Sequence, residues 1–371
     1  MNNILQVHDA EIEVLSPIHI GSGVKINKKE YVYNDISKKV HVVDLSKLYE
    51  HFCKLHREGA ITEFLLNKNI PLSQFMKNYS FNIEYFTKYS LDSSLQSAES
   101  LKNHEINSFI KDPYGFPYVP GSSIKGMIRS ALIAYRIFQN NSYLHELQQE
   151  LETELEKELE RNYSKKNSRA NKKCLGGLVN KRIESVFDKK ISDKESLKLF
   201  SGLIVSDSRP IMEKDSLILA QKVDYSLKGN KSFLPIYKES LRPETKIRFT
   251  ITIDRSLLPI SIDNIKEALD FYQNLAYEYF YKKYGRGDNS KGIVWLGGGA
   301  GFTSKTVIYQ LFSENAHSIT NKILECTLGE KIYEMHNHDK YVRDVSPHMC
   351  KCTMYSGNLY DVGKGRINFF N

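Results

Sequence analysis

The sequence lacks the long apolar runs and the regular cysteine spacing that mark membrane and secreted proteins. No stretch reaches about 18 consecutive apolar residues, the length from which a membrane-spanning helix is inferred. The first segment carries Asp9, Glu11 and Glu13, whereas a signal peptide has a basic end followed by an apolar run. The cysteines form an odd, scattered set: Cys53, Cys174, Cys326, Cys350 and Cys352. This pattern favours reduced thiols, and we expect a cytoplasmic protein that binds no membrane.

The composition is otherwise that of an ordinary globular protein. Of 371 residues, 41% are apolar and 26% are charged, which excludes collagen-like, mucin-like and disordered chains. The length allows a buried core in about two to three domains. Lysine and arginine number 52 against 44 acidic residues, so the net charge is +8. This excess is compatible with a polyanionic partner such as a nucleic acid but is too small to establish one.

Alternating and helical periodicities occur in both halves of the sequence and predict an α+β fold. Ala10, Ile12 and Val14 alternate with charged residues, as in a half-buried strand. Helical spacing predicts one helix that follows Asp44 as its N-cap, and two more over 130–138 and 262–281. Further strands, some paired as hairpins, are predicted over 31–33, 40–43, 109–118, 203–205, 217–220, 246–253 and 293–296.

Residues 141–198 have the composition of an insertion. Leucine recurs every three or four positions over 144–159, which predicts an amphipathic helix with an acidic outer face. The following stretch, 161–183, contains eight Lys or Arg residues and no Asp or Glu. Such a run can follow a nucleic-acid backbone, or it can be a solvated linker, and both readings stay open.

Two glycine-containing segments are each followed by a predicted helix, which suggests two related α+β units. In the first, 120–129, Ser122 or Ser123 would cap the helix and Lys125 follows closely. The second, 297–306, comes after a predicted strand and contains Gly297, Gly298, Gly299, Gly301 and Lys305. Free backbone amides at a helix start, with a lysine beside them, suit a phosphate group. Neither segment has the G-x-x-x-x-G-K-[ST] pattern of a nucleoside-triphosphate site.

Basic and aromatic residues also alternate along a predicted strand-turn-strand segment, 222–238. The members are Lys222, Lys228, Lys231 and Lys238, with Tyr225, Phe233 and Tyr237 between them. This combination suits single-stranded RNA, because basic side chains bind its charged phosphates and aromatic side chains stack on its unstacked bases.

Two groups of residues could carry catalysis or bind a metal. His19 lies in a glycine turn and could act as a general acid or base, but no second positioned group is evident, so a structural or RNA-contacting role stays open. His336, His338, His348, Cys350 and Cys352 fall within 17 residues and are ligand types that suit zinc. Because Cys-x-Cys is not the usual zinc-knuckle spacing, we expect neither a metal nor a cofactor.

Three segments together resemble the RAMP superfamily of CRISPR systems: 16–23, 119–130 and 297–306. The second is the most specific, and their order and spacing cover most of the chain. Within the superfamily the sequence is most similar to the fifth subunit of the type III-A Csm effector complex. The resemblance implies two ferredoxin-like, RRM-related domains: 1–215, with the helical and basic insertion at 141–198, and 216–371, with the glycine loop at 297–301.

The resemblance also implies a function in antiviral defence. A protein of this kind binds the guide RNA (crRNA) without cutting it and caps the backbone filament near the 3′ end of the guide. It assembles against the neighbouring RAMP subunit and other Csm subunits, and it supports crRNA maturation by bringing in cellular nucleases. The RNA-binding residues expected here are His19, Gly21, Ser22, Gly23, Lys25, Ser122, Ser123, Lys125, Arg129, Lys222, Lys228, Lys231, Gly297, Gly298, Gly299, Gly301 and Lys305.

One departure from the family argues against cleavage of a target RNA. Relatives that cut the target have an Asp shortly after the histidine-glycine turn, whereas here the first Asp after the turn is Asp35. Two alternatives remain. One is a metal-independent RAMP endoribonuclease that processes CRISPR RNA with His19, and the other is a protein-binding scaffold that docks through 144–183.

Overall fold

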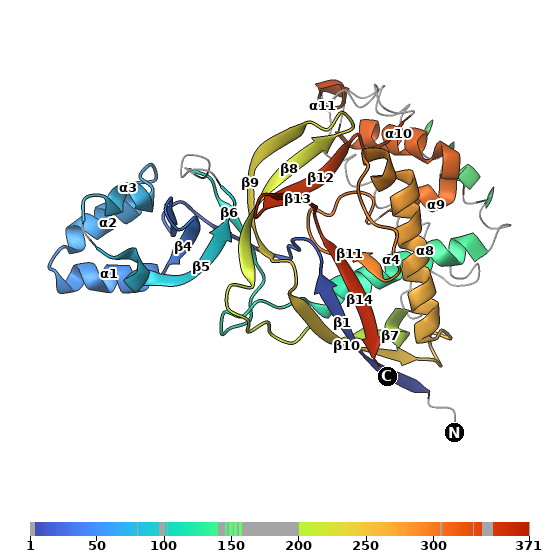
Figure 1. The fold of residues 1–371 in the computed structure, drawn as a ribbon, viewed down its shortest axis with the longest axis horizontal. Helices are drawn as coiled ribbons and strands as arrows, with labels where there is room; N and C mark the ends of the chain where they lie inside the picture. Colours follow the sequence, from blue (N-terminus) through green and yellow to red (C-terminus); the bar gives the residue numbers. More distant parts are fainter. Residues whose placement is uncertain are drawn as a thin grey trace.

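The computed structural model shows two curved β-sheets with helices packed around them (Figure 1). The α+β class expected from the sequence is therefore confirmed. The described residues are 4–79, 81–95, 101, 103–139, 145–146, 148–150, 152–153, 156–157, 200–304, 306–328, 330–335 and 344–370.

The first sheet has five strands in the order β11-β14-β1-β10-β7, and all of its pairings are antiparallel. The bounds are β1 Leu5–Val14, β7 Leu203–Val205, β10 Lys246–Asp254, β11 Ile293–Trp295 and β14 Lys364–Phe370. In the centre, Ile12 pairs with Ile247 on one side and with Ile367 on the other, and all three are buried. The alternation predicted for the first strand is thus confirmed, because one face of the sheet collects the apolar side chains.

Two long helices contribute to the same core as this sheet. α4 (Gly121–Gln139) and α8 (Ile262–Tyr279) pack against each other, and their buried side chains join those of the strands. α8 begins at a capping box, since the Ser261 side chain accepts from the Asn264 amide and the Asn264 side chain accepts from the Ser261 amide. Shorter elements complete this part: η5 Phe200–Gly202, η6 Tyr281–Tyr284, α9 Ile308–Phe312, η7 Ser313–Asn315, α10 Ala316–Leu328 and α11 Glu330–Met335.

The second sheet follows the order β2-β6-β9-β8-β5-β4-β3, and β12 adds to it by pairing with β8 and with β13. The bounds are β2 Gly21–Ile26, β3 Tyr31–Asn34, β4 Lys39–Val43, β5 Thr87–Ser93, β6 Ile106–Phe109, β8 Leu217–Ser226, β9 Lys231–Leu241, β12 Met349–Tyr355 and β13 Asn358–Asp361. The predicted hairpin of β3 and β4 is confirmed. β8 and β9 form the long curved hairpin near the middle of Figure 1.

A helical lobe, residues 44–86, projects from the second sheet at the left of Figure 1. Its elements are α1 Leu45–Lys54, α2 Glu58–Leu66, α3 Leu72–Met76 and η1 Ile83–Phe86. The predicted cap is confirmed, because the Asp44 carboxylate accepts from the amides of Ser46 and Lys47. The buried side chains of the lobe form a cluster of their own, separate from the main core.

The proposed domain boundary and the insertion stay partly untested. The boundary between 215 and 216 lies just before β8, and each sheet takes strands from both sides of it, so the division stays a prediction. In the insertion, the described residues from 145 to 157 are helical, and the basic run 161–183 lies outside the described residues. No helix in the described part of the chain combines the length and apolar composition that crossing a bilayer requires.

Candidate nucleic-acid interface

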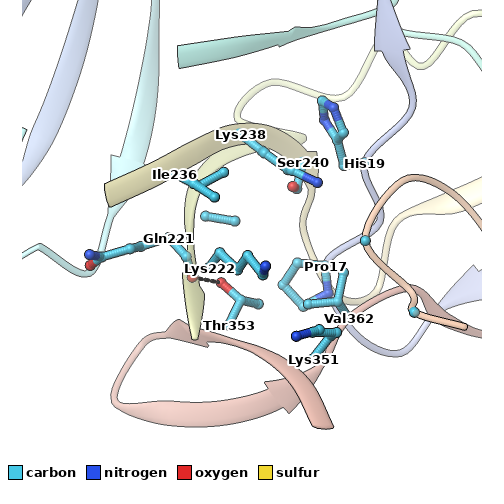
Figure 2. A pocket seen from close by; sticks show the side chains of 13 residues that line it. Pro17, His19, Gln221, Lys222, Ile236, Lys238, Ser240, Lys351, Thr353 and Val362 are labelled. Atoms are coloured by element: carbon cyan, nitrogen blue, oxygen red, sulfur yellow. Dashed lines mark hydrogen bonds between the residues drawn. The ribbon is translucent and has the colours of Figure 1, made fainter. Parts of the chain in front are cut away.

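A cavity of about 390 Å³ lies where the β8–β9 hairpin, β12 and two loops meet. Three lysines line it, Lys222, Lys238 and Lys351, and no Asp or Glu is among its described lining residues. Figure 2 shows the three lysines around one space, with His19 and Ser240 on one side and Thr353 on the other. The two loops are the His19 turn and the late glycine loop, which the sequence analysis treated as separate motifs.

The His19 turn and the late glycine loop are held together by backbone contacts. The Gly298 amide donates to the His19 carbonyl oxygen over 2.7 Å. Gly297 has φ +92°, and a Cβ at this position would lie 2.4 Å from the same oxygen. Only glycine fits both the left-handed backbone and the close approach. Gly299 and Gly301 then reach the cavity itself.

The imidazole of His19 is held in one orientation. Its Nδ1 lies 2.6 Å from the backbone carbonyl oxygen of Glu239, and the side chain is 5% exposed. Because a carbonyl oxygen only accepts, Nδ1 carries the proton and Nε2 of the neutral ring is left as an acceptor. Burial lowers the pKa of His19, and the charge of Lys238 lowers it further, against the raising effect of the Glu239 carbonyl. His19 is therefore a neutral residue that contributes to the cavity wall.

Glu239, behind the cavity, ties four segments together. Its carboxylate is fully buried and accepts from the Tyr89 hydroxyl (2.6 Å), the Ser108 hydroxyl (3.1 Å), the Phe109 amide (2.8 Å) and the Lys111 ammonium. Burial, followed by the negative charge of Glu239, raises the pKa of the Tyr89 hydroxyl well above its ordinary value. Because Lys238 and Glu239 are consecutive on β9, their side chains point to opposite faces, and the buried carboxylate faces away from the cavity.

The Asp224 carboxylate contacts the ammonium groups of two of the cavity lysines. Both of its carboxylate oxygens lie 3.0 Å from the Lys351 ammonium, which stands directly opposite on β12. The Lys222 ammonium is 3.7 Å from the same carboxylate. Lys238 donates to the Gly298 carbonyl oxygen over 3.0 Å. Burial, and then the charge of Lys351, lowers the pKa of Lys222, so the lysines repel one another across the cavity.

The first glycine segment differs from the prediction. α4 begins at Gly121 and not near Ser130, so Ser122 and Ser123 lie inside its first turn and do not cap it. The Gly121 amide donates to the Asp207 carboxylate over 2.7 Å, and a Cβ there would lie 2.2 Å from the Val205 carbonyl oxygen. This glycine therefore serves close packing between α4 and β7, and the first amide of the helix is already taken.

In the second segment, β11, the glycine loop and α9 follow one another in the predicted order, but the helix begins beyond the loop. The described residues between Gly301 and Ile308 are not helical, the Ile308 amide donates to the Thr306 hydroxyl, and α9 then has only five residues. Lys305 lies outside the described residues. The late loop acts through its contacts with the His19 turn, and α9 starts several residues after the last glycine of the loop.

The remaining predicted RNA-binding residues lie outside the cavity lining. Gly21, Ser22, Gly23 and Lys25 are exposed on β2, an edge strand, where the Lys25 ammonium pairs with Glu105. Lys125 and Arg129 lie one turn apart on α4, and the Arg129 guanidinium stacks 5.3 Å from the Phe200 ring. Lys228 and Lys231 are exposed at the tip of the β8–β9 hairpin. RNA binding by these residues stays a prediction.

The sequence analysis missed the parts that Lys351, Lys238 and Asp224 play at the cavity. Lys238 was noted in a basic segment but was not placed among the RNA-binding residues, and Lys351 was not noted. The pairing of β12 with β8 brings Lys351 near Lys222, and no local sequence pattern predicts that pairing. Asp224 lies on β8 between Val223 and Tyr225, where alternation alone indicates only a strand.

The structure places Cys350 and Cys352, two of the five ligand-type residues noted in the sequence, next to Asp361. The sulfur atoms of Cys350 and Cys352 are 4.0 Å apart and buried, with the Asp361 carboxylate nearby. The Arg286 guanidinium pairs with Asp361 and compensates its charge. A hydrogen bond with Cys352, together with burial, raises the pKa of the Cys350 thiol and disfavours the thiolate that a metal needs. His336 and His338 lie outside the described residues, and metal binding is not proposed.

The comparisons with known proteins agree with the resemblance seen in the sequence. The model of the RAMP superfamily matches residues 11–305. The CRISPR system protein Csm5 of Streptococcus thermophilus is 31% identical over 327 residues, which are 84% of this chain and 82% of that protein. The Csm5 protein of Mycobacterium tuberculosis is 26% identical over 401 aligned residues and 99% of both chains.

Two solved structures share the fold. A chain of the cryo-EM structure of a type III-A Csm-crRNA-target RNA ternary complex has a TM-score of 0.64 at 19% identity, covering 97% of this chain and 100% of its own length. The crystal structure of Csm5 from T. onnurineus has a TM-score of 0.61 at 17% identity, covering 96% and 99%. The RAMP-type α+β fold expected from the sequence is confirmed by these matches. The chain belongs to the RAMP superfamily and, within it, to the Csm5 family of CRISPR systems.

Proposed function

We propose that this chain is the subunit of a type III-A Csm complex that holds the guide RNA and caps the backbone filament near the 3′ end of that RNA. The family relationship supports a place in a Csm complex, and the structural neighbour from a Csm-crRNA-target RNA complex supports crRNA and other Csm subunits as partners. Adjacent RAMP subunits would contact it along the filament. The recruitment of cellular nucleases for crRNA maturation is a further part of this proposal.

The cavity is the observation that carries the RNA-binding proposal. It joins two of the three segments that resemble RAMP proteins, because the Gly298 amide bonds the His19 carbonyl oxygen. It is lined by three lysines and, within the described residues, by no acidic side chain. A phosphate backbone needs this combination of positive charge and closely approaching main chain.

The outer face of the first sheet is a poor alternative for RNA. In RRM proteins the open face of the sheet stacks bases on aromatic side chains. Here the central strand β1 presents Asp9, Glu11 and Glu13 on that face, and the Glu11 carboxylate is paired with Arg248 (2.9 Å) and Lys246 (3.4 Å). The Glu11 carboxylate already engages the neighbouring cations of β10, which supports the cavity at the second sheet as the better candidate for RNA binding.

The placement of His19 supports a holding role without cleavage. General acid-base cleavage of RNA works best with two positioned groups. The described lining residues offer one buried imidazole, and its Nδ1 proton is committed to the Glu239 carbonyl oxygen. One observation favours the alternative of an endoribonuclease that uses His19: the neutral imidazole has an acceptor Nε2 in a cavity that contains several ammonium groups.

A complex purified with its guide RNA tests the proposal. Lys238→Gln should weaken guide retention and lower the slope of log affinity against log salt by about one, the loss expected for one phosphate contact. Lys47→Gln, an exposed lysine on α1, is the matched control and should behave as the wild type. Unchanged retention in Lys238→Gln would contradict the proposal. If the wild-type chain instead cleaves CRISPR RNA without Mg²⁺ and His19→Ala stops the cleavage, the endoribonuclease is the correct function.

A further inference from the structure

The helical lobe contains a pocket of its own, of about 310 Å³, which shares none of its described lining residues with the lysine cavity. These residues are Leu55, Arg57, Asn78, Tyr79 and Phe81. The first two lie between α1 and α2, and the other three follow α3. Because the lobe projects from the second sheet (Figure 1), this lobe pocket belongs to a part of the molecule that is separate from the proposed RNA contacts.

Two aromatic rings form the firm side of the lobe pocket. The rings of Tyr79 and Phe81 are stacked, with their centroids 5.6 Å apart and 9° between their planes. The ring of Phe52, which is fully buried in the lobe core, meets both of them edge-on at centroid distances of 4.9 Å and 5.6 Å. Because core packing fixes these rings, a ligand does not have to order them, and binding loses little conformational entropy.

Arg57 brings a positive charge to the rim of the lobe pocket. Its side chain is exposed, and its guanidinium lies 5.6 Å from the centroid of the Tyr79 ring. Within the part of the chain that the structure describes, no carboxylate pairs with this guanidinium, and neighbouring Glu58 makes no ion pair with it. The described lining residues include no Asp or Glu. A guanidinium presents its donors as a planar fork that suits a carboxylate or a phosphate.

The charge and the surface of the lobe favour a carboxylate carried by a protein. Residues 44–86 contain five Lys or Arg and five Asp or Glu, and 5 − 5 = 0, so the lobe lacks the positive excess that attracts a nucleic acid. Apolar surface continues beside the pocket. Leu55 is 43% exposed, and the Phe81 ring contacts that of His51, which lies 6.4 Å from the 74% exposed Tyr85. Arginine and tyrosine are enriched among the residues that dominate protein interfaces.

We propose that the lobe pocket is a docking site for a neighbouring protein subunit and that it receives an acidic side chain with an apolar or aromatic side chain beside it. The carboxylate accepts from the Arg57 guanidinium, and the apolar side chain covers Leu55 on the rim. The volume is at the lower end of the range for small-molecule sites, roughly 300–1,000 Å³, which suits a few side chains and not a folded segment. The inference rests on the proposed place in a multi-subunit complex and adds a surface through which a subunit is held.

Site-specific photo-crosslinking in the purified complex tests this inference. The photoreactive residue p-benzoylphenylalanine replaces Leu55 at the lobe pocket, or Tyr49 as the matched control, since Tyr49 is 39% exposed on α1 and does not line the pocket. Irradiation should join position 55 to another protein subunit, close to an Asp or Glu identified by mass spectrometry, and position 49 should give much less of this product. Arg57→Gln should lower the yield at position 55 about tenfold, the loss of one charge-assisted pair, and Arg57→Lys, which keeps the charge without the fork, should lower it less.

The outcomes separate this inference from the proposed function. Equal yields at the two positions, a crosslink from position 55 to RNA, or an undiminished yield in an Arg57→Gln protein of wild-type thermal stability would each overturn the docking site. With guide RNA still retained, those results would leave the proposed function in place. A wild-type complex that lacks guide RNA but still shows the crosslink from position 55 to a subunit would overturn the proposed RNA binding and support the docking site.

Discussion

The helical lobe and the lysine cavity are built in opposite ways. In the lobe, residues 44–86, helices that follow one another along the chain pack into one small core, with Phe52 in contact with the rings of Phe75 and Tyr79. The cavity takes its lining from segments near the beginning, the middle and the end of the chain. The lobe therefore depends on local sequence, and the cavity depends on how the sheets are paired.

This difference bears on how each region should respond to mutation. A separate core can lose stability without disturbing the rest of the molecule, whereas a region held by contacts far apart in sequence couples its stability to its binding site. Buried Glu239 is the clearest such contact, because its carboxylate joins β5, β6, β9 and the loop at Lys111.

The largest expected effect is in the lobe. Phe52→Ala should lower the free energy of unfolding of the lobe by about 3–5 kcal/mol, because it removes a fully buried ring from an aromatic cluster. Thermal denaturation should show an early transition for the lobe, while guide retention stays within about twofold of the wild type. Tyr49→Ala, an exposed position on the same helix, should change stability by less than about 0.5 kcal/mol. A single transition that shifts as a whole, with loss of RNA, would show that the two regions are not independent.

A substitution of Glu239, behind the cavity, should lower stability less than Phe52→Ala does but should lower guide-RNA retention more. Glu239→Gln should cost about 1.5–3 kcal/mol, since it weakens hydrogen bonds made to a charged group, and it should also lower guide retention. The matched control is Glu105→Gln, which breaks the exposed pair with Lys25 and should cost about 0–1 kcal/mol. Chemical denaturation and RNA co-purification measure the two quantities. Normal RNA retention in a destabilised Glu239→Gln protein would contradict the coupling.

The smallest effect concerns pH. Burial lowers the folded-state pKa of His19 below its ordinary value of 6.5, so the unfolded chain takes up a proton at a higher pH than the folded chain. The stability that neutral His19 contributes is fully present above pH 6.5 and is lost as the pH falls from 6.5 through the folded-state pKa. Between pH 8 and pH 5, the unfolding free energy should therefore fall less in His19→Gln than in the wild type. The control Lys47→Gln should keep the wild-type pH dependence, and identical slopes in wild type and His19→Gln would refute the assignment.

The sequence predicts the locally determined parts of the molecule well. The cap at Asp44, the hairpin of β3 and β4, and the alternation of β1 and β10 depend on neighbouring residues, and each is confirmed. The start of α4 was missed although its apolar spacing is visible, because Gly121, Ser122 and Ser123 have the composition of a turn. The contact of Asp207 with the first amide of the helix, which lies far along the chain, replaces the predicted serine cap.

The candidate site was predictable only in pieces. The two loops and Lys222 were found as motifs, but their meeting at one cavity follows from the contact of Gly298 with His19. Lys351 joins them through the pairing of β12 with β8, which no periodicity reveals. A sequence pattern fixes which face of a strand is buried, whereas it does not fix which strand is its neighbour.

The position of β1 has a consequence for biosynthesis. This strand lies in the middle of the first sheet and has β10 on one side and β14 on the other. Residues 5–14 are made before both of their hydrogen-bonding neighbours, and the second of these is made only when residues 364–370 emerge. Until then one edge of β1 has unpaired backbone groups, so the first sheet stays incomplete until residues 364–370 are made.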